Sequence, residues 1–106
     1  MTRTARTDAA DRIAFIVRRS CELAGSPVYT FSDPCRARPM VRARRIATIA
    51  LRKLGMTYAE IGAVIGRTRN GVRHMHVAAS IGDVGQALRV LGEVRDRQKP
   101  LAPVAE

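Results

Sequence analysis

The segment GRTRNGVRHMH, residues 66–76, contains three arginines, one asparagine and two histidines within eleven residues. Arginine pairs with the O6 and N7 atoms of guanine, and asparagine with the N6 and N7 atoms of adenine, each through two parallel hydrogen bonds. Histidine side chains can instead hold a metal ion. The segment therefore admits three interpretations: a surface that reads DNA bases, a metal site, or a solvated helix face.

The spacing of the two histidines argues against a metal site. His74 and His76 are two residues apart, so on a helix they point in different directions. No cysteine or carboxylate lies nearby at ligand spacing. The chain also lacks a pair of catalytic carboxylates, a glycine-rich phosphate loop and a nucleophile motif. We therefore expect no metal, no cofactor and no enzymatic activity.

The distribution of charge favours a nucleic-acid partner. The chain has 19 Lys and Arg residues against 9 Asp and Glu, a net charge of +10. Residues 36–73 alone hold ten of the basic residues and one acid, Glu60, which places +9 in this block. Such a block between nearly neutral flanks is typical of a nucleic-acid-binding surface. An anionic membrane or an acidic protein is the alternative partner.

Hydrophobic periodicity predicts five helices, over about residues 8–24, 40–54, 57–65, 69–80 and 83–97. Thr57 and Glu60 have the spacing of a capping box at the start of the third helix. Gly66 supplies a tight turn, and Thr68 can cap the fourth helix. Two short helices around such a turn are typical of a helix-turn-helix. We expect an all-α fold, a compact bundle of about five helices that contains a helix-turn-helix.

Two helix faces carry specific expectations about the core. In the second helix the positions that follow the helical period are Ala43, Ile46, Ala47, Ala50 and Leu54. In the last helix Asp83 should be the cap, and Val84, Leu88, Leu91 and Val94 or Arg95 should line the core. The alternative for this helix is that Leu88 and Leu91 are presented to a partner.

The sequence also indicates the extent of the domain, the state of its cysteines and its location. We expect residues 1–7 to be disordered, residues 8–98 to form one helical domain and residues 99–106 to form a flexible tail. Cys21 and Cys35 lack CxxC spacing and should be reduced thiols.

No apolar run reaches the ~18 residues of a membrane span, and no signal peptide begins the chain. We expect a cytoplasmic, nucleoid-associated protein with no membrane partner.

The run CRARPMVRARRIATIALRKLGMTYAEIGAVIGRTRNGVRHMH, residues 35–76, resembles the C-terminal DNA-binding domain of DnaA, the bacterial replication initiator. That family carries an arginine-rich stretch, an "RxIAxxL" helix, then "S-L-x-E-I-G" and "F-G-G-R-D-H-T-T-V-x-H-A". The matching residues are Arg36, Arg42, Arg44, Ile46, Ala47, Thr57, Glu60, Ile61, Gly62, Gly66, Arg67, Val72 and His74. The resemblance implies a Trp-repressor-like helix-turn-helix. The nucleotide-binding module of a full initiator is absent, so the chain would be a stand-alone relative, such as a phage or accessory regulator.

The resemblance also implies a role for each matched residue. Arg36 aligns with the arginine that enters the minor groove, and Arg44 with an arginine of the basic helix. Arg52 aligns with a lysine near phosphates. Thr57 and Tyr58 open the first helix of the motif, whose N-terminus lies against the DNA backbone. The full set expected to contact DNA is Arg36, Arg42, Arg44, Arg45, Arg52, Thr57, Tyr58, Arg67, Thr68, Arg69, Asn70 and Arg73.

The sequence departs from the family where DNA bases are read. The Asp-His-Thr-Thr quartet is replaced by Thr68, Arg69, Asn70 and Gly71, and one of the two preceding glycines is missing. The usual DnaA box is therefore in question as the target, whereas the added arginine strengthens phosphate attraction. A shorter likeness joins TRNGV, residues 68–72, to the "TRNAV" of GcrA-like cell-cycle regulators.

Two functions follow from these observations. The first is a double-stranded DNA-binding regulator of replication initiation or transcription, in which Arg36 probes the minor groove and Arg69, Asn70 and Arg73 read the major groove. The second is a mimic of the DnaA domain that occupies a replication or cell-cycle regulatory protein. A mimic needs the fold and the basic surface but not the reading residues. No motif in the sequence indicates an oligomeric state.

Overall fold

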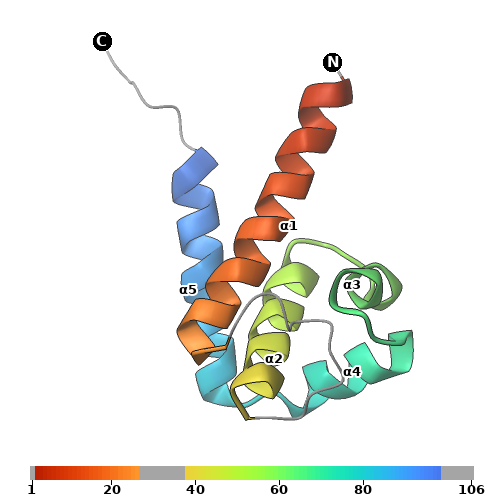
Figure 1. The fold of residues 1–106 in the computed structure, drawn as a ribbon, viewed down its shortest axis with the longest axis vertical. Helices are drawn as coiled ribbons and strands as arrows, with labels where there is room; N and C mark the ends of the chain where they lie inside the picture. Colours follow the sequence, from red (N-terminus) through yellow and green to blue (C-terminus); the bar gives the residue numbers. More distant parts are fainter. Residues whose placement is uncertain (1, 27–37, 99–106) are drawn as a thin grey trace.

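A computed structural model of the chain describes residues 2–26 and 38–98, with the side chains of residues 9–26 and 38–96. This described part contains five α-helices and no strand. The helices are α1 (Thr2–Ala24), α2 (Arg38–Lys53), α3 (Tyr58–Ile65), α4 (Arg69–Ala78) and α5 (Ile81–Gln98), shown in Figure 1. The predicted all-α fold is confirmed. The predicted tail, residues 99–106, lies outside the described residues.

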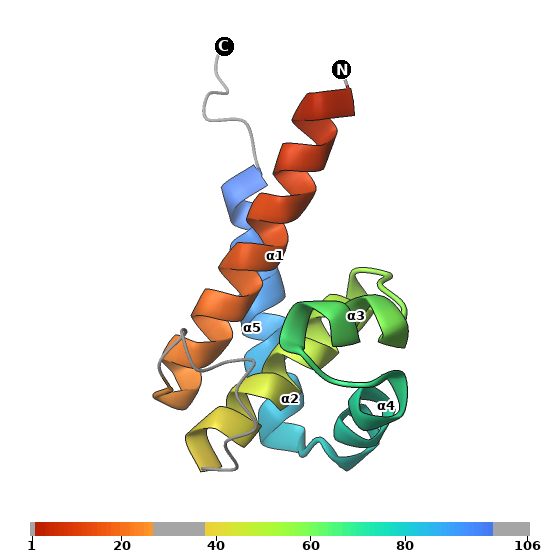
Figure 2. The ribbon, with the colours of Figure 1, turned by 45° about the vertical axis from the view of Figure 1, so that its right-hand side comes forward.

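Helix α2 lies at the centre of the bundle and packs against each of the other four helices. Helices α1 and α5 lie together on one side of it, and α3 and α4 lie together on the other (Figures 1 and 2). Its buried residues are Met40, Ala43, Arg44, Ile46, Ala47, Thr48, Ile49, Ala50 and Leu51. Three of these are alanines, whose small side chains let neighbouring helices approach α2 closely.

The core positions predicted for α2 are confirmed except for the last one. Of the five predicted positions, Ala43, Ile46, Ala47 and Ala50 are fully buried. Leu54, in contrast, is 44% exposed. Helix α2 ends at Lys53, and Gly55 turns the chain with a φ of +98°. Leu54 therefore lies beyond the helix, where the helical period no longer directs its side chain to the core.

Helix α5 begins earlier than predicted. Of its predicted core positions, Val94 is buried, Val84 and Leu91 are partly buried against the core, and Leu88 is exposed. The Asp83 N–H donates to Ser80 Oγ at 3.1 Å, and the Ser80 N–H donates to the Asp83 carboxylate at 3.0 Å. This reciprocal pair starts the helix at Ile81, so Asp83 is inside it and not its cap. The buried apolar positions of α5 are Ala87, Val90 and Val94. Leu88 lies about 100° around the helix from Ala87, which leaves it 52% exposed.

Helix α1 begins at Thr2, whereas the predicted start was Asp8. No glycine or proline interrupts residues 2–24, and alanines favour the helical conformation there. Arg19 ties this helix to α5, since its Nε donates to Glu93 Oε1 at 2.8 Å. That hydrogen bond holds the pKa of the Glu93 carboxyl below its usual value.

Cys21 is a free thiol buried in the core on α1. Burial raises its pKa to about 11, and the neighbouring Glu22 carboxylate acts in the same direction, while the Arg44 guanidinium opposes them. Cys21 is therefore protonated at neutral pH, and reduced as predicted. Cys35 lies outside the described residues.

Burial of Cys21 predicts a protected thiol. In a Cys35→Ser variant, the thiol should react with a disulfide reagent at about pH 8 at least about 100-fold more slowly in the folded protein than in urea, because only an exposed thiolate attacks. A spectrophotometric time course measures both rates. Because the folded-state pKa is the higher one, the thiol should also lower the stability as pH rises from 9 towards about 11. Similar reaction rates for the folded and unfolded chains would contradict the buried position.

Candidate nucleic-acid interface

The two short helices α3 and α4 are joined by the three residues Gly66, Arg67 and Thr68. The predicted capping box at the start of α3 is present. The Thr57 N–H donates to Glu60 Oε1 at 2.8 Å, and the Glu60 N–H donates to Thr57 Oγ1 at 3.1 Å. The only acid of the basic block is therefore held at the N-terminus of α3.

The turn between α3 and α4 is shaped by backbone hydrogen bonds. Gly66 ends α3 in the left-handed conformation, with a φ of +73° that favours glycine. The N–H groups of Gly66 and Arg67 both donate to the Gly62 carbonyl, at 2.8 and 3.0 Å. Thr68 then caps α4, because its Oγ1 accepts a hydrogen bond from the Gly71 N–H at 3.0 Å. The predicted roles of Gly66 and Thr68 are confirmed.

Helix α4 is held by one buried side chain and exposes the rest of its first turns. Val72 is fully buried, and α4 contacts both α2 and α3. Arg69, Asn70 and Arg73 are exposed, and none of the three makes a side-chain hydrogen bond or ion pair to another described residue. Their bonding groups are therefore available to a partner. The sequence prediction that these three side chains face outward is confirmed.

Arg52, Tyr58 and His76 form a connected group at the N-terminus of α3. The Arg52 guanidinium lies over the Tyr58 ring, 4.8 Å from its centroid, and donates to the Met56 carbonyl at 2.9 Å. The Tyr58 hydroxyl is hydrogen-bonded to His76 Nδ1 at 2.8 Å. This bond joins the start of α3 to the second half of α4. The sequence pattern did not predict it, because the two residues are 18 positions apart and neither belongs to a local motif.

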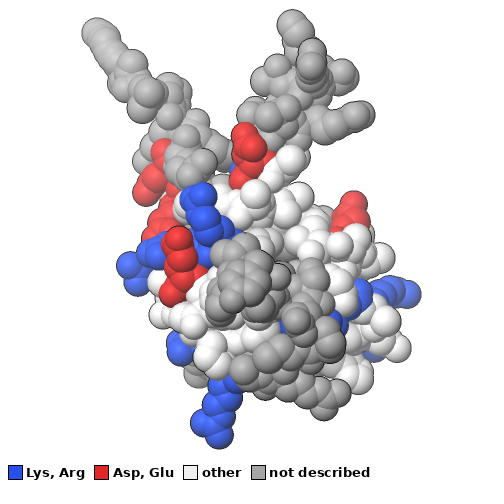
Figure 3. Space-filling model, viewed as in Figure 1, with Lys and Arg blue, Asp and Glu red and all other residues white. Residues whose placement is uncertain are grey.

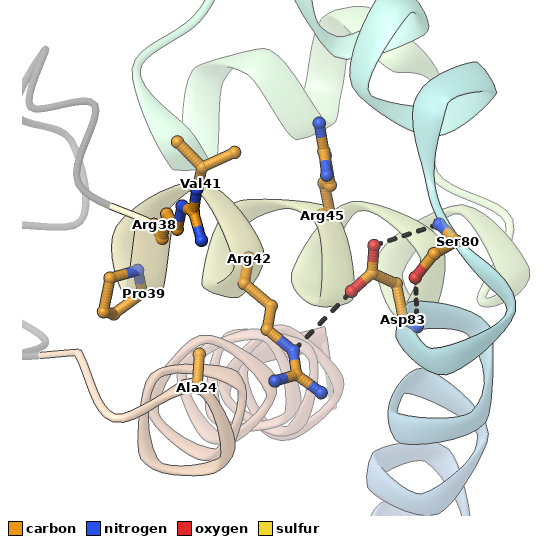
Figure 4. Close-up of a pocket in the computed structure, with 8 residues that line it drawn as sticks. All are labelled: Ala24, Arg38, Pro39, Val41, Arg42, Arg45, Ser80 and Asp83. Carbon is orange, nitrogen blue, oxygen red and sulfur yellow. Dashed lines mark hydrogen bonds and ion pairs between the residues drawn. The ribbon is translucent and has the colours of Figure 1, made fainter.

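Helix α2 contributes a second group of arginines. Arg38, Arg42 and Arg45 line a hollow of about 670 Å³, together with Ser80 and Asp83 of the α5 N-terminus (Figure 4). Arg42 Nε lies 3.8 Å from Asp83 Oδ1. Arg45 points in a different direction from Arg42, and its buried Nε has no hydrogen-bond partner among the described residues. Arg38 is exposed on the first turn of α2. It belongs to the arginine run but was not among the predicted contacts.

The position of Arg44 corrects one expectation from the sequence. Arg44 was expected to face phosphates, but it is only 3% exposed. It lies in the middle of α2, which other helices cover on several sides, and its charge acts on the buried Cys21 thiol. Arg44 therefore belongs to the interior of the bundle. Arg36, expected to enter the minor groove, lies outside the described residues.

The remaining predicted contacts lie at the start of α3 and in the turn. Tyr58 is partly buried, Thr57 and Thr68 are exposed as helix caps, and Arg67 donates to the Gly66 carbonyl at 3.1 Å. In the view of Figure 3 the acidic side chains lie over the upper part of the molecule, whereas the basic side chains extend to its lower and right-hand edges. The lower part contains α4 and the N-terminal half of α2 (Figure 1). Basic side chains also lie among the acidic ones on the left of this view, and only at the lower and right-hand edges do they appear without acidic neighbours.

Comparisons with protein families, with curated proteins and with solved structures found no match to this chain. Among the residues that the structure describes, no group of three His, Cys, Asp or Glu side chains could hold a metal ion. Within residues 2–26 and 38–98, no helix has both the length and the apolar character needed to cross a membrane.

The contact between Gly62 and the turn predicts a sharp difference between two glycines. A Cβ atom on Gly62 would overlap the carbonyl oxygen of Arg67, whereas a Cβ on Gly85 of α5 would meet nothing within 4 Å. Gly62→Ala should therefore lower the free energy of unfolding by about 1–3 kcal/mol. Gly85→Ala should leave it unchanged or raise it by up to about 1 kcal/mol. Urea unfolding followed by circular dichroism measures both, and equal effects would contradict this packing of α3 on the turn.

Proposed function

We propose that this protein binds double-stranded DNA through a helix-turn-helix formed by α3, the turn 66–68 and α4. In this proposal α4 enters the major groove, and the protein is a relative of the DnaA C-terminal domain that regulates replication initiation or transcription. The observation that carries the proposal is the exposed face of α4, where Arg69, Asn70 and Arg73 have no partner among the described residues.

The chemistry of that face supports reading of base edges. The N-terminal residues of a recognition helix meet the bases in the major groove, and Arg69 and Asn70 are the first two residues of α4. Arginine prefers guanine and asparagine prefers adenine. Arg73 lies one turn further along on the same side of the helix. Since these residues replace the quartet by which the DnaA family reads its box, we expect a different base preference.

Phosphate contacts would come from the arginines around α4. Arg38, Arg42 and Arg45 lie on α2, against which α4 packs. Arg52 is held over Tyr58 at the N-terminus of α3, where the helix dipole also attracts an anion. Arg67 lies in the turn itself. Together they would neutralise several phosphates, which gives an affinity that falls steeply with salt.

The proposal predicts tight, salt-dependent binding to duplex DNA. Fluorescence anisotropy with a labelled duplex should give a submicromolar Kd at about 50 mM salt and an affinity about 100-fold lower at about 200 mM salt, as four or more phosphate contacts require. A DnaA-box duplex, a shuffled duplex and a single strand are the three ligands. Absence of duplex binding at low salt would overturn the proposal and favour the mimic, whose binding partner would be a regulatory protein.

Base-reading and phosphate-contacting residues should respond differently to substitution. With a duplex selected from a random pool, Asn70→Ala should lower the binding free energy for the selected site by about 1–3 kcal/mol. It should also relax the base preference at one position of that site. Arg38→Ala should weaken binding to all duplexes alike and reduce the slope of log affinity against log salt concentration by about 1. Arg89→Ala, which removes an exposed arginine of α5, is the control and should change neither. Equal behaviour of Asn70→Ala and Arg38→Ala would show that the assigned roles are wrong.

A further inference from the structure

Two exposed leucines lie together on the part of the bundle formed by α2 and α5. Among the described residues the large hydrophobic side chains that are exposed are Leu54, Val77, Ile81 and Leu88. Leu54 and Leu88 line the same hollow of about 450 Å³, together with Leu91 and Gly92. This volume is within the range of ligand-binding pockets, about 300–1,000 Å³.

A second apolar hollow adjoins the first at Leu54. It has a volume of about 200 Å³ and is lined by Leu54 and Met56 together with Ala9 and Ile13 of α1. Leu54 lines both hollows, so the two adjoin at this residue, one on the side of α1 and the other on the side of α5. We call this surface the Leu54 groove.

The charged residues that line the two hollows are all basic. Lys53 and Arg95 line the larger hollow and Arg12 lines the smaller one, and no acidic residue lines either of them. Two copies of this chain meeting at the groove would bring these like charges together, which disfavours self-association. The apolar floor and basic edge instead complement a partner that combines apolar side chains with carboxylates.

Gly92 leaves room for a partner backbone in the larger hollow. A Cβ atom on Gly92 would meet nothing within 4 Å, although the residue lies well inside α5 (Ile81–Gln98). Glycine inside a helix costs about 1 kcal/mol relative to alanine. The open space beside Gly92 allows another helix to approach α5 closely, as small residues do at helix–helix contacts.

We propose that the Leu54 groove binds an acidic amphipathic helix of a partner protein. Its apolar side chains, spaced at i, i+3 or i+4 and i+7, would occupy the two hollows. Its carboxylates would pair with Lys53, Arg95 and Arg12. None of these three basic residues is among the DNA contacts proposed above, so the partner and DNA would use different side chains. The protein would then bring an acidic partner to its DNA site.

A pair of designed peptides tests this proposal. The probe is a fluorescein-labelled helix of about 18 residues with leucines on one face and glutamates elsewhere, and its counterpart has lysine in place of every glutamate. The acidic peptide should bind the full chain with a Kd below about 100 μM, at least about tenfold more tightly than the basic peptide. No binding of the acidic peptide at about 1 mM, or equal binding of both peptides, would overturn the proposal.

Matched substitutions locate the binding to the groove. Gly92→Leu fills the larger hollow and should weaken the binding of the acidic peptide at least about tenfold. Gly85→Leu, on the same helix but outside both hollows, is the control and should change the Kd of the peptide by less than about twofold. The double variant Lys53→Glu, Arg95→Glu should lower the affinity for the acidic peptide about tenfold and reduce the salt dependence of that binding. Equal effects of Gly92→Leu and Gly85→Leu would overturn the proposal.

Two further measurements separate the alternatives. Sedimentation that shows a dimer abolished by Gly92→Leu would assign the groove to a second copy and overturn the proposal. Binding to vesicles containing anionic lipid that Gly92→Leu abolishes would assign it to a membrane, with the same consequence. All of these assays use no DNA, and Gly92→Leu should leave duplex binding unchanged. Failure of the groove proposal is therefore distinguishable from failure of DNA binding.

Discussion

The burial of α2 by all four other helices is the constraint on which the rest of the structure depends. Its alanines and isoleucines provide the contact surface for the pair α1 and α5 on one side and the pair α3 and α4 on the other. The α1–α5 pair is tied by the Arg19–Glu93 ion pair, and the α3–α4 pair by the glycine turn and the Tyr58–His76 hydrogen bond. Each pair reaches the core through α2, so a change in α2 would move both.

This arrangement separates two surfaces, one polar and basic and the other apolar with a basic edge. Val72 directs one face of α4 to the core, which leaves Arg69, Asn70 and Arg73 on the outside. At the C-terminal end of α2 the chain leaves the helix at Leu54, which lines one hollow beside α1 and another beside α5. The exposed face of α4 offers hydrogen-bond donors suited to base edges, and the Leu54 groove offers apolar volume with a basic edge.

Local sequence signals predicted the elements that surround the proposed interface well. The capping box of Thr57 and Glu60, the glycine at position 66 and the cap at Thr68 are each set by contacts within four residues, so the pattern alone is sufficient to identify them. The outward direction of Arg69 and Asn70 follows from the same turn. The family relationship and the DNA partner remain predictions.

The errors in the sequence interpretation concern contacts between distant segments. Arg44 fits a basic helix face in the sequence, but its side chain is buried in the folded protein. Leu88 fits an apolar stripe, yet the helix turns Ala87, which shares a face with Val90 and Val94, to the core. The bond between Tyr58 and His76 depends on how α4 packs against α3. Periodicity identifies a helix and its apolar side, but it does not tell which of two adjacent positions the neighbouring helix covers.

The most direct test of the account is a nuclear magnetic resonance titration of the ¹⁵N-labelled chain with duplex DNA. If α4 reads the major groove, the largest amide shifts should fall on residues 67–74, with smaller shifts at the N-termini of α2 and α3. The amide resonances of residues 88–95 along the Leu54 groove should not shift. Shifts that spare α4 and fall instead on α5 would contradict the central claim.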